Sequence, residues 1–86
     1  MALMNERHNF QKIRWHSRRG MLELDLILLP FAEECFLQLP EAEQDDYVRL
    51  LDCEDQDLLA WLLGHSEPTD LKLRDMVALI RQQRTV

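Results

Sequence analysis

Glycine, cysteine and long apolar runs are all scarce in this chain of 86 residues. Two glycines, Gly20 and Gly64, are too few for a glycine-rich phosphate-binding loop. The longest apolar run covers residues 26–29, or 26–32 if Pro30 is allowed, whereas a membrane-spanning helix needs about 20 residues. The polar start of the sequence lacks the apolar stretch of a secretion signal. We therefore expect a cytoplasmic protein that does not insert into membranes.

Metal-binding and redox patterns are also missing from the sequence. Cys35 and Cys53 match neither a CxxC redox pair nor a zinc knuckle, and we expect two reduced, partly buried thiols. His8, His16 and His65 form no HxxxH or HExxH pattern. No set of these residues has ligand spacing, so we expect no metal site.

Charge is present in quantity, but it is unevenly distributed. The net charge of −6 hides two basic ends, residues 1–20 and 71–86, around a middle in which 14 acidic residues face Arg49 alone. The ends either neutralise the middle within the fold or orient the chain toward a charged partner. An acidic chain without finger, RNP or basic-zipper patterns is not expected to bind nucleic acid.

The length and the hydrophobic fraction of 47% predict one small domain over residues 1–86. Such a chain buries one modest core and leaves little room for a deep cleft that encloses a substrate. Helical periodicity and cap residues predict the fold class, a small all-α bundle of five helices. The first helix is expected over about 6–17, with Asn5 as its cap.

The second expected helix begins after Gly20. Alternate leucines at positions 22–28 imitate a strand, but no second strand-like run exists to pair with it. Because residues 21–29 are apolar nearly all round, we expect this helix to be central. Pro30 predicts a kink or a restart, and the apolar face continues to Leu39.

Three further helices are expected after the boundary at Leu39-Pro40. Acidic residues at the starts of the third and fourth helices suit the positive end of a helix dipole, and Gly64 ends the fourth. Four acidic residues lie around the start of the fourth helix: Asp52, Glu54, Asp55 and Asp57. We interpret them as N-terminal capping residues and a solvated face rather than as a metal-binding loop. Trp61 is expected in the core. The last helix follows residues 65–70, and its apolar positions have helical spacing: Leu73, Met76, Val77 and Ile80.

The segment 15–25 is harder to explain by the fold alone, because the basic and acidic blocks meet there at Gly20. If Gly20 is an N-cap, Glu23 lies at N3 and can complete half of a capping box. Arg18 and Arg19 do not suit the positive start of a helix. Either the acidic face of the same molecule or a partner bound by bidentate geometry should stabilise them.

Residues 19–23 form an RGxxE motif, followed by Asp25. With this motif the sequence resembles the small FAD assembly factor family, also called succinate dehydrogenase assembly factors. The likeness extends over about residues 7–82 and includes the segments IRW at 13–15, PF at 30–31, RLLDCED at 49–55 and LLAWL at 58–62.

The resemblance implies a five-helix accessory protein rather than an enzyme. Members promote covalent attachment of FAD to the flavoprotein subunit of succinate dehydrogenase, and bacterial members also act on fumarate reductase. The partner carries the FAD, so we expect no tightly bound cofactor. We also expect the chain to be monomeric. An older label for the family gives the alternative, an antitoxin or regulatory binder of a toxin–antitoxin-type pair.

The resemblance also implies a partner-binding surface around the motif. Its members are Arg19, Gly20 and Glu23, flanked by Arg18 and Asp25, with Trp15 as a further contact. Arg19 could pair with a partner carboxylate, and Gly20 permits close backbone approach. Glu23 could accept a hydrogen bond or assist a proton transfer, and we assign no catalytic residue.

Overall fold

The computed structural model describes residues 9–83, and within that range every regular element is a helix. The five α-helices are α1 (Phe10–Ser17), α2 (Leu22–Glu34), α3 (Glu41–Leu51), α4 (Asp55–Leu62) and α5 (Leu71–Gln83), with a short 3-10 helix η2 (Phe36–Gln38). The predicted all-α class and helix order are confirmed. The expected cap Asn5 and His8 lie outside the described residues.

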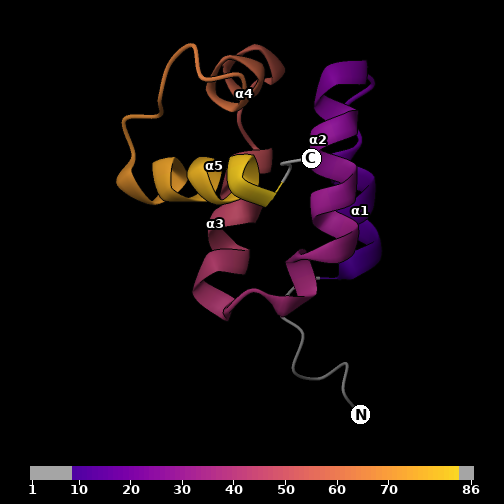
Figure 1. Ribbon diagram of the computed structural model, residues 1–86. Coiled ribbons are helices and arrows are strands. Elements are labelled where there is room, and N and C mark those ends of the chain that lie inside the picture. Colours follow the sequence, from indigo (N-terminus) through magenta and orange to yellow (C-terminus); the bar gives the residue numbers. More distant parts are fainter. Residues whose placement is uncertain (1–8, 84–86) are drawn as a thin grey trace.

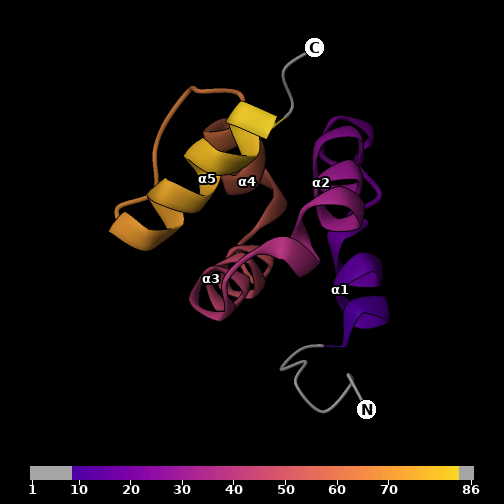
Figure 2. The ribbon, with the colours of Figure 1, turned by 60° about the horizontal axis from the view of Figure 1, so that its bottom comes forward.

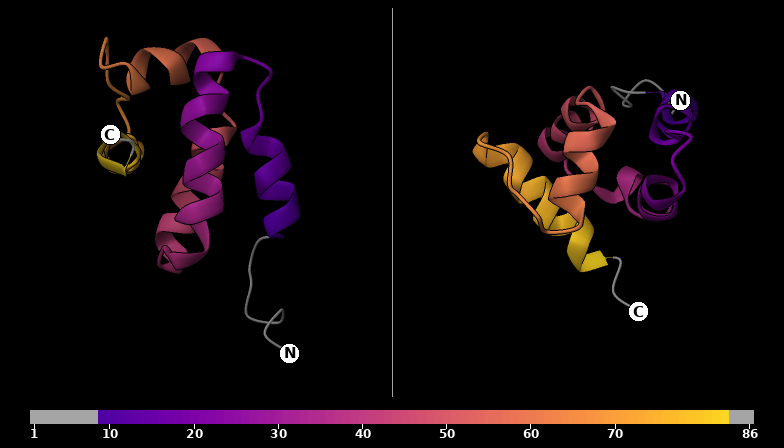
Figure 3. Two further views of the ribbon diagram at one scale, coloured as in Figure 1. Left: turned by 45° about the vertical axis from the view of Figure 1, so that its right-hand side comes forward. Right: turned by 90° about the horizontal axis from the view of Figure 1, so that it is seen from above.

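Helices α1 and α2 lie side by side, and α3, α4 and α5 lie together next to this pair, with α3 contacting α1 (Figures 1 and 2). Helix α2 contacts α1, α4 and α5, while α5 also packs on α3. The turn between α1 and α2 lies at the end of the molecule where α3 gives way to α4 (Figure 3). This arrangement brings sequence-distant segments close to the RGxxE motif.

Local sequence explains several helix ends. Asn9 caps α1, because its Oδ1 accepts hydrogen bonds from the backbone N–H groups of Gln11 and Lys12. Helix α1 therefore begins at Phe10 rather than at residue 6. Gly64 ends α4 as predicted, at φ +84°. Its N–H donates to the Trp61 carbonyl and the His65 N–H donates to the Ala60 carbonyl, which together form a Schellman motif.

Helix α2 differs from its prediction in two ways. It is one helix through Pro30, so of the two alternatives expected there, a kink or a restart, the restart is wrong. It is central, but it is not buried all round: Leu22 is 69% exposed and Leu26 is 66% exposed. Its buried residues follow a single stripe at i, i+3, i+4, i+7 and i+8: Leu24, Ile27, Leu28, Phe31 and Ala32.

Within residues 9–83, the core holds one buried polar arrangement. The hydroxyls of Ser17 and Tyr47 share a hydrogen bond of 2.7 Å, and Ser17 Oγ also donates to the Ile13 carbonyl. The Tyr47 ring packs against Phe31 and Phe36, with centroids 5.3 and 5.5 Å away. Burial raises the pKa of Tyr47 to about 12, outweighing the hydrogen bond with Ser17 and the charge of Arg19, which both lower it. The last turn of α1 is thereby fixed to α3.

Trp61 is only half-buried against the core, so its expected core position is met in part. Cys35 and Cys53 are free, half-buried thiols, as predicted. Burial raises the pKa of both thiols, with further contributions from nearby carboxylates, so neither is activated as a nucleophile. Among the described residues, no helix combines the length and the apolar character needed to cross a bilayer.

Candidate functional site

The candidate site is the turn between α1 and α2 together with the helix ends that flank it. Gly20 is exposed at φ +80°, and a Cβ added there would meet no atom within 4 Å. The N-cap of α2 is Met21, which makes no side-chain cap bond, and not Gly20, the alternative considered from the sequence. Glu23 therefore lies at the second helical position, and the expected capping box does not form.

The two arginines of the turn differ completely in environment. The Arg18 side chain is exposed and makes no ion pair with any residue in the range 9–83. The Arg19 side chain is only 12% exposed, and its Nε donates to Asp55 Oδ1 at 2.7 Å. The acidic middle of the chain thus stabilises Arg19, which is one of the two alternatives left open by the sequence.

Three backbone carbonyls complete the environment of the Arg19 guanidinium. Its Nη1 donates to the carbonyls of His16 and Leu51 at 3.0 and 2.9 Å, and its Nη2 donates to that of Cys53 at 3.1 Å. His16 and Leu51 belong to the C-terminal ends of α1 and α3, where carbonyls are free and the helix dipole favours a cation. Four of the five guanidinium N–H groups are used in this way. The expectation that Arg19 pairs with a partner carboxylate does not suit a side chain so fully engaged.

Asp25 is also occupied within the turn. Its Oδ1 accepts from the backbone N–H of Arg19 at 2.7 Å, and the residue is half-buried in the first turns of α2. Asp25 and Asp55 thus fix the backbone and the side chain of Arg19 respectively.

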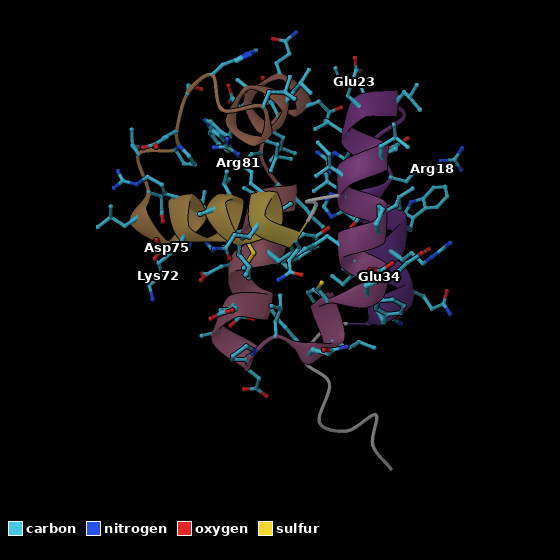
Figure 4. The ribbon with its side chains drawn as sticks, viewed as in Figure 1. Arg18, Glu23, Glu34, Lys72, Asp75 and Arg81 are labelled. Carbon is cyan, nitrogen blue, oxygen red and sulfur yellow. The ribbon has the colours of Figure 1, made fainter. Side chains whose placement is uncertain are left out.

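The residues that face solvent around the turn are partly charged and partly apolar. Figure 4 shows the side chains of Arg18 and Glu23 projecting outward from the part of the molecule where α1 joins α2. Trp15 in α1 is 74% exposed, and Leu22 and Leu26 lie one turn apart on the outer side of α2. We call Trp15, Arg18, Gly20, Leu22, Glu23 and Leu26 the turn surface. Trp and Arg, both exposed here, are among the residue types enriched at protein interaction sites.

Sequence reasoning missed Leu22, Leu26 and Asp55. The two leucines were expected to be buried, although the stripe at positions 24, 27, 28 and 31 already accounts for the core face of α2. Asp55 was expected only to cap α4, and no local pattern could connect it with Arg19, 36 residues earlier.

The described hollows of the surface lie away from the motif. One hollow of about 470 Å³ is lined by residues of both α3 and α5, including Glu43, Lys72, Asp75 and Met76. Figure 4 shows Lys72 and Asp75 on the side of the molecule opposite Arg18. Within the described residues, no group of three or more His, Cys, Asp or Glu is arranged to hold a metal.

Comparison with known proteins assigns the family. Residues 11–84 match the family Sdh5, described as flavinator of succinate dehydrogenase. The chain is 54% identical over 66 residues to the FAD assembly factor SdhE of Vibrio cholerae, covering 77% of each chain. It is 47% identical over 77 residues to that of Pseudomonas putida, covering 90% of this chain and 92% of the relative.

A solved structure agrees with these relatives. The solution structure of a UPF0350 protein is 51% identical and superimposes with a TM-score of 0.70, over 85% of this chain and 78% of the other. The chain therefore belongs to the Sdh5 family of succinate dehydrogenase flavinators. Its relatives are named assembly factors, which are accessory proteins, so the expectation of a helper rather than an enzyme is confirmed.

Proposed function

We propose that this chain is an assembly chaperone that promotes covalent attachment of FAD to the flavoprotein subunit of succinate dehydrogenase. The family match over residues 11–84 is the observation that carries the proposal. The proposal includes the flavoprotein subunit of fumarate reductase as a second partner. The chain acts in the cytoplasm as a monomer, one copy on one flavoprotein.

The flavoprotein is bound through the turn surface, with Arg19 and Asp25 holding the turn from beneath. The exposed side chains of Trp15 and Arg18, residue types enriched at interfaces, support this assignment. The open space around Gly20 allows a partner backbone to come close. Glu23 contributes a carboxylate that accepts a hydrogen bond from the flavoprotein or assists a proton transfer near the flavin.

The FAD remains in the flavoprotein throughout and is not a cofactor of this chain. A site for such a ligand encloses most of its surface in a pocket of about 300–1,000 Å³. The motif residues instead lie on an exposed turn, and the 470 Å³ hollow between α3 and α5 contains none of them. When bound in the partner, the flavin supplies the redox chemistry itself. The helper needs only to hold the partner in a productive geometry, and correct orientation is worth about 7–11 kcal/mol of a barrier.

Covalent flavin in a strain that lacks the chromosomal copy of this chain tests the proposal. Wild type and Glu34→Ala should restore in-gel flavin fluorescence of the flavoprotein, while Glu23→Ala should not. Glu34 is a matched control because it is an exposed carboxylate at the other end of α2 (Figure 4). Normal fluorescence with Glu23→Ala would exclude the proposed site. Normal flavin loading in the deletion strain itself, with toxicity that depends on a neighbouring gene, would favour the antitoxin alternative.

A further inference from the structure

Asp55 lies on α4, outside the RGxxE motif, yet it makes the only ion pair of Arg19 among the described residues. We infer that Asp55 is a positioning residue of the candidate site: through Arg19 it sets the geometry in which the turn presents Gly20 and Glu23. The expected effect of Asp55 on flavoprotein binding rests on the proposed function. Its effect on the geometry of the turn does not.

The first step of the argument is that Arg19 joins three helix ends. Its guanidinium binds carbonyls at the ends of α1 and α3, the Cys53 carbonyl in the following turn, and the carboxylate of the first residue of α4. Only the Asp55 contact pairs opposite charges. The carboxylate adds an attraction between opposite charges that the neutral carbonyls lack, so Asp55 is the strongest single determinant of where the guanidinium lies.

The second step is that Arg19 is held at both ends. Asp25 binds its backbone N–H and Asp55 binds its side chain, each at 2.7 Å. Gly20 and Met21 lie between Arg19 and the start of α2, and the flexible backbone of the glycine would otherwise adopt many conformations. Fixing Arg19 therefore removes the main freedom of the turn, and it does so before any partner arrives.

The third step is that nothing else on the described part of the chain replaces Asp55. Asp57 lies in the same first turn of α4, but it is exposed and makes no ion pair within residues 9–83. Without the Asp55 carboxylate, a guanidinium that is 12% exposed retains only carbonyl partners. Arg19 would then exchange between positions, and the turn would pay an ordering cost on binding.

The isolated chain tests the geometry directly by NMR. In wild type and in Asp57→Ala, the Arg19 Nε–H should exchange slowly with water and keep its chemical shift. In Asp55→Ala it should exchange rapidly, and the amide signals of Gly20 and Glu23 should broaden or move. An unchanged, protected Nε–H signal in Asp55→Ala would overturn the inference.

Affinity for the purified flavoprotein subunit tests the consequence. Asp55→Ala should weaken binding on the order of tenfold, as expected for loss of an orienting charge-assisted hydrogen bond. Asp57→Ala should bind like wild type, and Asp55→Asn, which keeps an acceptor oxygen, should recover part of the loss. Circular dichroism must show that each variant remains helical at the assay temperature, and Asp55→Asn serves if Asp55→Ala does not fold.

The outcomes separate this inference from the proposed function. If Glu23→Ala weakens binding but Asp55→Ala does not, the positioning role is wrong and the proposed site stands. If neither variant weakens binding while the Arg19 signal is lost in Asp55→Ala, the geometry is right and the proposed site is wrong.

Discussion

The two glycine turns of this protein have the same backbone conformation but are held in different ways. Gly20 and Gly64 lie at φ +80° and +84°. The Gly64 turn is closed by backbone hydrogen bonds between neighbours in sequence. The Gly20 turn is held by side chains from distant positions, Tyr47 and Asp55. The Gly20 turn is held in place by residues distant in sequence, and its outer surface is open. These two features suit a turn that binds a partner better than one that only connects two helices.

The largest expected difference between the turns is functional. Gly20→Arg should reduce covalent flavin on the flavoprotein to background, because the new side chain projects into the open space that a partner backbone would occupy. Gly64→Arg places the same residue in the same backbone region, displaces the flexible Arg81 side chain, and should leave flavin loading intact. In-gel flavin fluorescence with matched expression compares the two. Equal loss in both would remove the distinction between the turns.

Alkaline pH should reveal the support beneath the Gly20 turn. The pKa of Tyr47 is raised from 10.0 to about 12 by burial. Because the folded state favours the neutral hydroxyl, its contribution to the free energy of unfolding is fully present below pH 10 and is lost as the pH rises through 12. The loss amounts to about 2–3 kcal/mol. Chemical denaturation between pH 8 and pH 12 measures the loss. Tyr47→Phe should lack this component, and an equally steep alkaline loss in that variant would assign it to other groups.

Alanine at either glycine should cost a similar amount of stability. An L-residue at positive φ is strained by about 1–2 kcal/mol, so Gly20→Ala and Gly64→Ala should each lower the free energy of unfolding by that amount. The added Cβ at Gly64 lies 2.9 Å from Arg81 Nη2, but the end of a flexible side chain can move away. Thermal unfolding of both variants checks this. A much larger loss at Gly20 would mean that its turn carries the fold as well as the site.

The smallest effect is expected far from the Gly20 turn, at Asp70. Its Oδ1 caps α5 and its Oδ2 pairs with Arg49 in α3. The hydrogen bond from Arg49, followed by those from the backbone, holds the pKa of Asp70 below 3.8. The pair therefore contributes stability above that pH and loses it as the pH falls further. Asp70→Asn keeps the cap and should change stability at pH 7 only slightly, because exposed pairs contribute little. Acid unfolding curves should show a smaller loss of stability in Asp70→Asn than in wild type. In-gel flavin fluorescence should show unchanged flavin loading.

The same comparison explains what the sequence could and could not predict. The end of α4 at Gly64 was predictable, because the Schellman motif depends on adjacent residues. The N-cap of α2 at Met21 was not predictable, and Gly20 remained an alternative, because the turn geometry depends on carboxylates at positions 25 and 55. The all-α class followed from periodicity, whereas the exposure of Leu22 and Leu26 followed only once the core stripe of α2 was identified.

The central claim is that the turn surface acts directly on a flavoprotein that carries its own FAD. The most direct measurement is a reconstitution with purified components: apo-flavoprotein subunit, FAD, and this chain as wild type, Gly20→Arg or Gly64→Arg. We expect covalent flavin, followed by in-gel fluorescence over time, to form faster with wild type and Gly64→Arg than with no addition. Gly20→Arg should give the rate without addition. The same rate in all four reactions would contradict the account.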